Sequence, residues 1–234
     1  MNDSSRRRAP KERCVAKREY HVDYEHLSQQ VYRMLKHMIL VGELKTGEKL
    51  RQDDLAERLG VSRTPLLSAF SKLEKEMLVE TVPRRGAFVK KYELAELVDI
   101  YEIRLRLEPL GAAEAARRGT DQQKVELVER CNEFTQLVEA EDPSLKEVDY
   151  QFHMHIMEMS GNHLLYNIIS SYSIIPVANF YGLFKQPDQS ASEHRRLCAA
   201  ITDGKVTAAR KEMFQHIRSA LTHLRELIAE QSGQ

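Results

Sequence analysis

The feature that most restricts the fold of this chain lies between residues 52 and 77, where two short helical segments meet at Gly60. Residues 52–60 (QDDLAERLG) place their apolar side chains on one helical face. Residues 63–77 (RTPLLSAFSKLEKEM) show the same spacing after Ser62, whose side chain suits an N-cap position. Two short helices joined by such a tight turn are typical of a helix-turn-helix.

The neighbouring segments extend this unit. Residues 27–41 also have apolar residues at helical spacing, which predicts a helix before the pair. Residues 78–82 alternate in polarity, Pro83-Arg84-Arg85-Gly86 predicts a turn, and residues 87–89 predict a returning strand. We therefore expect a winged helix-turn-helix of three helices and a β-hairpin wing, in a domain that spans residues 23–92.

The pattern changes at Glu93, after which the periodicity is helical throughout. We expect helices at about 93–118 (with a kink at Pro109), 121–140, 144–160, 162–185, 189–202 and 205–231, separated by glycine, proline and aspartate breaks. Helices joined by short breaks pack as antiparallel neighbours. Residues 93–234 are therefore predicted to form an antiparallel bundle of six or seven helices, and the whole chain to be mainly α.

The net charge of the 234-residue chain is zero, but the charges are unevenly distributed. Residues 1–92 contain 20 Lys and Arg against 13 Asp and Glu, whereas residues 93–234 contain 15 against 22. This asymmetry indicates that only the front half meets a polyanion. A solvated basic tail at residues 1–22, which we expect to be disordered because it lacks apolar periodicity, would shift the count in the same way.

Three features indicate a cytoplasmic protein without a membrane segment. Cys14, Cys131 and Cys198 are odd in number and far apart, which is typical of a reducing compartment. The first twenty residues lack the apolar core of a secretory signal. Residues 159–184 carry no Asp, Glu, Lys or Arg, but they contain many polar residues, so we expect a buried bundle helix here.

Candidate DNA contacts gather at two places in the front domain. Ser62, Arg63 and Thr64 lie at the start of the predicted third helix, where free backbone N–H groups favour phosphate and an arginine can reach a guanine. Arg84, Arg85 and Gly86 form the tip of the predicted wing, a shape that fits a minor groove. Either run alone also fits a capped helix or a solvated turn, but their order and spacing together favour DNA binding.

Candidate metal ligands gather in the back domain. Asp149 and His153 are four residues apart on one predicted helix and therefore share a face, although such a pair is often a surface contact. His194 and His216 lie on either side of the predicted reversal at Asp203-Gly204, so antiparallel packing brings them level. One carboxylate and three imidazoles suit a divalent metal ion, zinc or nickel. From spacing alone His223 competes with His216, whereas His155 points away from His153.

Longer motifs connect the front domain to a known family. The runs GELKTGEKL (42–50), LAxxLGVSRTP (55–65) and PxRGAxV (83–89) resemble the GntR family of winged helix-turn-helix regulators. The resemblance implies double-stranded DNA as the partner. In the family the Ser-Arg-Thr-Pro run is usually followed by an Arg-Glu pair, but this chain has Leu67 and Ser68 there. Many members also have a basic residue near the position of Asp53, whereas the nearest basic residue in this chain is Arg51. These departures indicate an unusual operator or compensation by the basic tail.

The back domain resembles the FCD ligand-binding domain of the FadR-type branch of that family. The resemblance rests on DYQFH (149–153), SGNxxL (160–165), EHR (193–195), DG (203–204) and a late His216. In many members an Asp and three His bind a metal, which implies Asp149, His153, His194 and His216 as ligands here. The run RxxLE (104–108) resembles the branch's first bundle helix and implies Arg104 in effector binding. Such domains generally recognise small carboxylates.

We therefore expect a homodimeric, metal-containing transcription regulator, a repressor rather than an enzyme. Its affinity for a palindromic operator would change when a small organic acid binds the bundle. Two alternatives remain open. The chain can be a metal-dependent enzyme fused to a DNA-binding module, with Glu193 as a weak candidate base. The bundle can also serve dimerisation alone.

Overall fold

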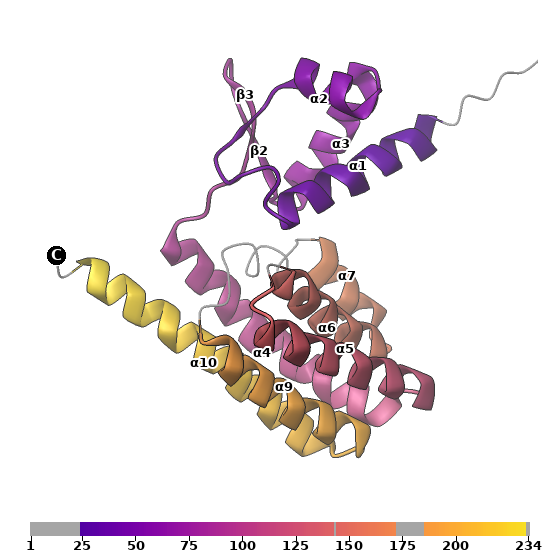
Figure 1. The fold of residues 1–234 in the computed structure, drawn as a ribbon, viewed down its shortest axis with the longest axis vertical. Helices are drawn as coiled ribbons and strands as arrows, with labels where there is room; N and C mark the ends of the chain where they lie inside the picture. Colours follow the sequence, from indigo (N-terminus) through magenta and orange to yellow (C-terminus); the bar gives the residue numbers. More distant parts are fainter. Residues whose placement is uncertain (1–23, 143, 172–184, 233–234) are drawn as a thin grey trace, which may run out of the picture.

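The computed structural model describes residues 24–142, 144–171 and 185–232 (Figure 1). The predicted tail at 1–22 and most of the second half of the predicted helix 162–185 lie outside these residues. In the front part, α1 (Tyr24–Leu40) packs against α3 (Arg63–Lys75). Between them in sequence, α2 (Gln52–Leu59) ends at Gly60, whose φ of +65° lets the chain reverse into α3. The predicted helix-turn-helix is therefore present.

A small antiparallel sheet completes the front part. The strands β1 (Lys49–Leu50), β2 (Val79–Val82) and β3 (Gly86–Val89) lie in the order β1-β3-β2. The β2–β3 hairpin is the predicted wing, and the Arg85 N–H closes its turn by donating to the Val82 carbonyl at 3.0 Å. The sequence did not predict β1, because two residues are too few to show alternation and only their pairing with β3 defines the strand.

The back part is a helical bundle, as predicted. Its helices are α4 (Leu94–Arg118), α5 (Asp121–Glu139), α6 (Leu145–Met159), α7 (His163–Ser171), α9 (Pro187–Thr202) and α10 (Val206–Ser232). The two long helices α4 and α10 run side by side (Figure 1). Reciprocal capping boxes begin α4 at Glu93 and α5 at Thr120. Within the described residues no helix combines the length and the apolar character that a membrane crossing requires.

One predicted helix differs from the structure. The predicted helix over about 162–185 extends at least one residue too far at its end, because Lys185 is not helical. Gln186 has the extended ψ of 134° that the ring of a following proline imposes, and Pro187 then occupies the first turn of α9. The last bundle hairpin therefore begins two residues earlier than predicted. Residues 172–184 lie outside the described residues.

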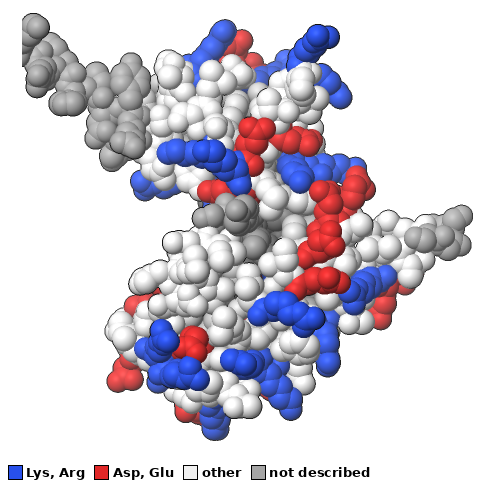
Figure 2. All heavy atoms as spheres, turned by 180° about the vertical axis from the view of Figure 1, so that it is seen from behind, with Lys and Arg blue, Asp and Glu red and all other residues white. Residues whose placement is uncertain are grey.

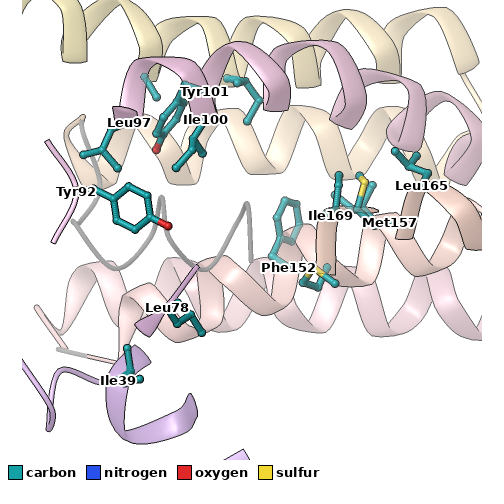
Figure 3. Packing of buried hydrophobic residues seen from close by; sticks show 14 of the residues in the cluster. Ile39, Leu78, Tyr92, Leu97, Ile100, Tyr101, Phe152, Met157, Leu165 and Ile169 are labelled. Carbon is teal, nitrogen blue, oxygen red and sulfur yellow. The ribbon is translucent and has the colours of Figure 1, made fainter. Parts of the chain in front are cut away.

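A single apolar core connects the two parts of the chain. Ile39 and Leu78 of the winged helix lie near Tyr92 and Leu97 at the start of the bundle, and the same cluster continues to Phe152 on α6 (Figure 3). The phenol of Tyr92 donates a hydrogen bond of 2.6 Å to the Met77 carbonyl, just after α3. The segment before α4 is therefore tied to the end of α3, which places the bundle directly behind the recognition unit.

Candidate metal centre and nucleic-acid interface

Helix α6 presents the first pair of predicted ligands. Asp149 and His153 lie one turn apart, and both are buried, with exposed fractions of 3% and 0%. The Asp149 carboxylate lies 4.0 Å from Nε2 of His153. The pair is therefore part of the bundle interior and not a surface contact.

Two further helices bring the other predicted ligands to the same place. His194 of α9 and His216 of α10 are both buried, and their ring centroids are 4.7 Å apart. One ring nitrogen from each of His153, His194 and His216 lies within 4.8 Å of the others. Nε2 of His194 also lies 3.4 Å from Oδ1 of Asp149. The four residues predicted from the sequence thus converge on one point from three helices.

Buried carboxylates contact two of these rings at Nδ1, the nitrogen that faces away from the other rings. Nδ1 of His153 lies 2.6 Å from Oε2 of Glu108, and Nδ1 of His216 lies 2.8 Å from Oε2 of Glu193. A carboxylate at Nδ1 selects the tautomer with the proton on that nitrogen and leaves the Nε2 lone pair for a cation. Nε2 of His153 and Nε2 of His216 face each other at 3.2 Å. His153 and His216 could together hold a metal ion, which would relieve the repulsion of the two lone pairs.

The third ring has no such support. Among the described residues, neither ring nitrogen of His194 makes a hydrogen bond, although both are buried. Burial, followed by the positive fields of His153, Lys185 and Arg104, holds the pKa of His194 well below its usual range. The ring is therefore a neutral imidazole with an unsatisfied buried nitrogen, which a metal ion would satisfy. The donor set consequently fits a divalent metal ion.

A small polar cavity adjoins the cluster. It offers about 20 Å³ to a water-sized molecule, room for about one water. Three of the candidate ligands line it, together with Tyr101, Arg104, Lys185, Ser190 and the apolar Ile217 and Ala220. The Ser190 hydroxyl is fully buried and has no hydrogen-bond partner among the described residues. Two cations and a free hydroxyl therefore face the space beside the predicted metal position.

Each of the two cationic side chains that line the cavity also forms an ion pair with a buried glutamate. Arg104 donates to Oε1 of Glu108, the carboxylate that also holds His153. Lys185 pairs with Glu193 and lies 2.9 Å from Nδ1 of His216. Sequence reasoning did not assign these roles to Glu108, Lys185 or Ser190. The i,i+4 spacing of Arg104 and Glu108 could have indicated their ion pair. Nothing in the sequence indicates that Lys185 lies beside His216.

The competing histidines lie elsewhere. His223 is exposed and pairs with Glu226 at 3.4 Å, one helical turn further along α10. His155 is buried, but its Nε2 contacts the Gln123 carbonyl at 3.0 Å. Glu193, the weak candidate for a general base, is engaged by Lys185 and His216. The geometry thus favours His216 over His223, as the resemblance implied.

The predicted DNA contacts on α3 are exposed. Ser62 occupies the N-cap position with an extended backbone, and its side chain makes no capping hydrogen bond. Arg63 pairs with Asp53 of α2 at 2.6 Å, and Thr64 is exposed. Arg51 lies just before α2 with its Nε 4.0 Å from Asp54. The N–H groups at the start of α3 therefore remain available to a phosphate.

The wing presents its arginines at the end of the molecule remote from the bundle. Arg84 and Arg85 are exposed, and Arg84 has a φ of +63°, which Gly86 follows with +101°. Figure 1 shows the β2–β3 turn and α2 at this same end. Lys and Arg side chains gather on the same end in Figure 2. The arrangement suits contacts with a polyanion.

These features define a class of protein: a winged helix-turn-helix transcription regulator with a helical C-terminal domain. Residues 27–89 match the model described as bacterial regulatory proteins, gntR family. Residues 99–219 match the FCD domain. The chain therefore belongs to the GntR family of DNA-binding transcription regulators and carries an FCD domain, a type of domain that commonly binds metal.

Curated relatives and solved structures agree with this assignment. The chain is 27% identical to the HTH-type transcriptional regulator YdhC of Bacillus subtilis (86% of this chain, 92% of YdhC). It is 27% identical to the HTH-type transcriptional repressor GlaR of Escherichia coli (85% of this chain, 96% of GlaR). The structure of McbR/YncC of E. coli superposes with a TM-score of 0.75 at 25% identity, covering 86% of this chain and 98% of McbR/YncC.

Proposed function

We propose that this chain is a cytoplasmic, homodimeric repressor that binds a palindromic operator and is controlled by a small organic acid. Residues 23–92 bind the DNA, and residues 93–234 bind the acid at a divalent metal ion, zinc or nickel. The observation that carries the proposal is the buried cluster of three imidazoles beside a cavity with two cations and a free hydroxyl.

Four residues hold the metal ion: Asp149, His153, His194 and His216. The two outer carboxylates, Glu108 and Glu193, orient the rings of His153 and His216. Bound metal supplies Lewis acidity and open coordination positions for effector oxygens. Lys185 also lies 2.9 Å from Nδ1 of His216, where it would favour the opposite tautomer, so Glu193 and Lys185 compete for this ring nitrogen.

A small carboxylate fits the adjoining cavity. Arg104 supplies positive charge from α4, and Lys185 supplies it from the segment just before α9. Ser190 supplies a hydroxyl that has no hydrogen-bond partner among the described residues. The cavity has room for about one water, so an effector larger than water must push the lining side chains apart when it binds. This requirement couples binding to the position of α4.

Helix α4 connects the cavity to the DNA-binding unit. Arg104 and Glu108 lie on α4, which begins directly after the Tyr92 side chain that is hydrogen-bonded to Met77 behind α3. Lys90 and Glu96 form a second contact at 3.3 Å across this junction. A shift of α4 on effector binding is thereby transmitted to α3, which changes the spacing of two recognition helices in a dimer.

Metal content and ligand binding test the proposal in one experiment. Purified protein should contain about one equivalent of zinc or nickel for each chain, and His194→Ala should lose it. His223→Ala is the matched control and should keep its metal, because this ring is exposed and paired with Glu226. A screen of small carboxylates should then raise the melting temperature of metal-loaded wild type and leave metal-free protein unchanged.

Each contrary outcome supports a defined alternative. Full metal retention in His194→Ala, with loss in His223→Ala, would place the site on another face of α10. Protein that never binds metal would leave the bundle a dimerisation domain. Turnover of an acid by metal-loaded protein would make it an enzyme.

A further inference from the structure

Two cysteines from different helices meet inside the bundle. Cys131 of α5 and Cys198 of α9 are 67 residues apart in the sequence, and both are buried. Neighbouring residues hold α5 against α9 at this level, because Phe134 packs on the His194 ring and Arg195 donates to the Thr135 hydroxyl at 3.3 Å. Each thiol also shifts the pKa of the other. Neither side chain is used by the metal centre or by the cavity. The two thiols therefore form a dithiol that the proposed regulator does not require.

The two thiols are not equivalent. The Cys198 side chain lowers the pKa of Cys131 below its usual range, and the positive field of Arg195 adds to this against the effect of burial. Arg195 is anchored nearby, because it donates to the Thr135 hydroxyl at 3.3 Å and Thr135 donates to the Cys131 carbonyl at 3.0 Å. The Cys131 side chain and burial raise the pKa of Cys198. The guanidinium of Arg195, held beside Cys131 through Thr135, therefore favours Cys131 as the nucleophile of the pair.

We propose that Cys131 and Cys198 are a redox-active dithiol that a hydroperoxide converts into an intramolecular disulfide. The Cys131 thiolate attacks one peroxide oxygen, the O–O bond breaks, and the leaving hydroxide takes up a proton to become water. Cys131 is then a sulfenic acid. The Cys198 sulfur attacks the Cys131 sulfur, the S–O bond breaks, and the hydroxide leaves with the Cys198 proton as a second water.

The two-electron balance is complete with the peroxide alone. Two thiols and one hydrogen peroxide yield one disulfide and two waters, and a dithiol reductant reverses the change. Formation of the disulfide requires the two sulfurs to approach to a bond length of about 2.05 Å. The proposal is independent of the regulatory function, because it requires neither the metal nor the effector.

A disulfide between Cys131 and Cys198 would lie close to the candidate metal ligand His194. Cys198 lies one turn after His194 on α9, and Phe134, three residues after Cys131 on α5, packs on the His194 ring at 4.6 Å between centroids. A disulfide would therefore tie α5 to α9 beside the third candidate metal ligand. Oxidation would act on the helix that carries His194.

Peptide mapping tests the proposal on the full chain. The Cys14→Ser background removes the third thiol, and the protein is treated with stoichiometric hydrogen peroxide, denatured and alkylated. We expect a peptide pair that contains Cys131 and Cys198, lighter than the two free peptides by two hydrogens and separated by dithiothreitol. Two alkylated thiols after this treatment would overturn the proposal. This measurement depends on no variant at the pair itself.

Two variants then test the order of the steps. Cys198→Ser should leave a sulfenic acid at Cys131 that dimedone labels, whereas Cys131→Ser should leave Cys198 unlabelled. The circular dichroism of both variants checks that the bundle is folded, and the Cys→Ala versions replace any that are not. Dimedone on Cys198, with none on Cys131, would overturn the assignment of Cys131 as the nucleophile.

Discussion

Replacement of Glu108 by glutamine should lower the free energy of unfolding of the metal-free protein by about 3 kcal/mol at pH 7. Glu108 is fully buried, and its carboxylate contacts the Arg104 guanidinium at 2.5 Å and Nδ1 of His153 at 2.6 Å. Glutamine keeps the shape but removes the charge, so the buried guanidinium of Arg104 loses its counterion.

The magnitude follows from the structure in two ways. Burial alone would raise the pKa of Glu108, but Arg104 and then His153 overcome this effect and hold the pKa at about 2, compared with an ordinary value of 4.5. At about 1.4 kcal/mol for each pKa unit, this difference corresponds to about 3 kcal/mol. Removing one partner of a buried ion pair typically costs about 3–5 kcal/mol, which agrees.

The pH dependence has a defined sign. Because the folded pKa lies below the unfolded one, the stabilisation by Glu108 is complete above about pH 4.5 and is lost as the pH falls toward 2. The difference in unfolding free energy between wild type and Glu108→Gln should therefore shrink over this interval. Subtracting the variant from wild type removes the contributions of the other carboxylates.

Urea unfolding at a series of pH values measures this difference, in the presence of a chelator. Glu102→Gln is the control, because Glu102 lies on the same helix and pairs with Arg225, but both side chains are about half exposed. Such a surface pair contributes about 0–1 kcal/mol. Equal stability of Glu108→Gln and Glu102→Gln, or a difference that does not change between pH 5 and pH 2, would refute the reasoning.

Three further predictions concern DNA and metal. Arg63→Ala should weaken operator binding by about 1–3 kcal/mol, and Arg84→Ala should weaken it on every sequence and flatten its salt dependence; binding titrations that show wild-type behaviour for both would exclude these contacts. Deletion of residues 1–20 should lower DNA affinity mainly at low salt and leave the melting temperature nearly unchanged, so a large thermal loss would contradict a solvated tail. Because burial lowers the pKa of both His194 and His216, protons should displace the metal only below the ordinary histidine range, which metal analysis after dialysis at successive pH values measures. Loss that is already complete at pH 6.5 would contradict this.

Local sequence determined the elements of the two domains. Gly60 and Ser62 mark the helix-turn-helix because the reversal of the chain and the extended backbone before α3 depend on residues close by in the sequence. The wing follows from alternation around Pro83 and Gly86 for the same reason. The three histidines and Asp149 were also accessible, since i,i+4 spacing and a hairpin of two helices define relative position with few alternatives.

Tertiary packing alone decided the surroundings of the candidate centre. Spacing left His216 and His223 as rivals, and the rotation of α10 against α9 and α6 placed one ring inside and the other in solvent. Glu108 and Lys185 reach the rings of His153 and His216 across 45 and 31 residues, so no local pattern predicts those contacts. The same holds for β1, which exists only because β3 returns beside it, and for the meeting of Cys131 with Cys198. Contacts between distant segments depend on how whole helices and strands pack, and this is information that a local pattern does not contain.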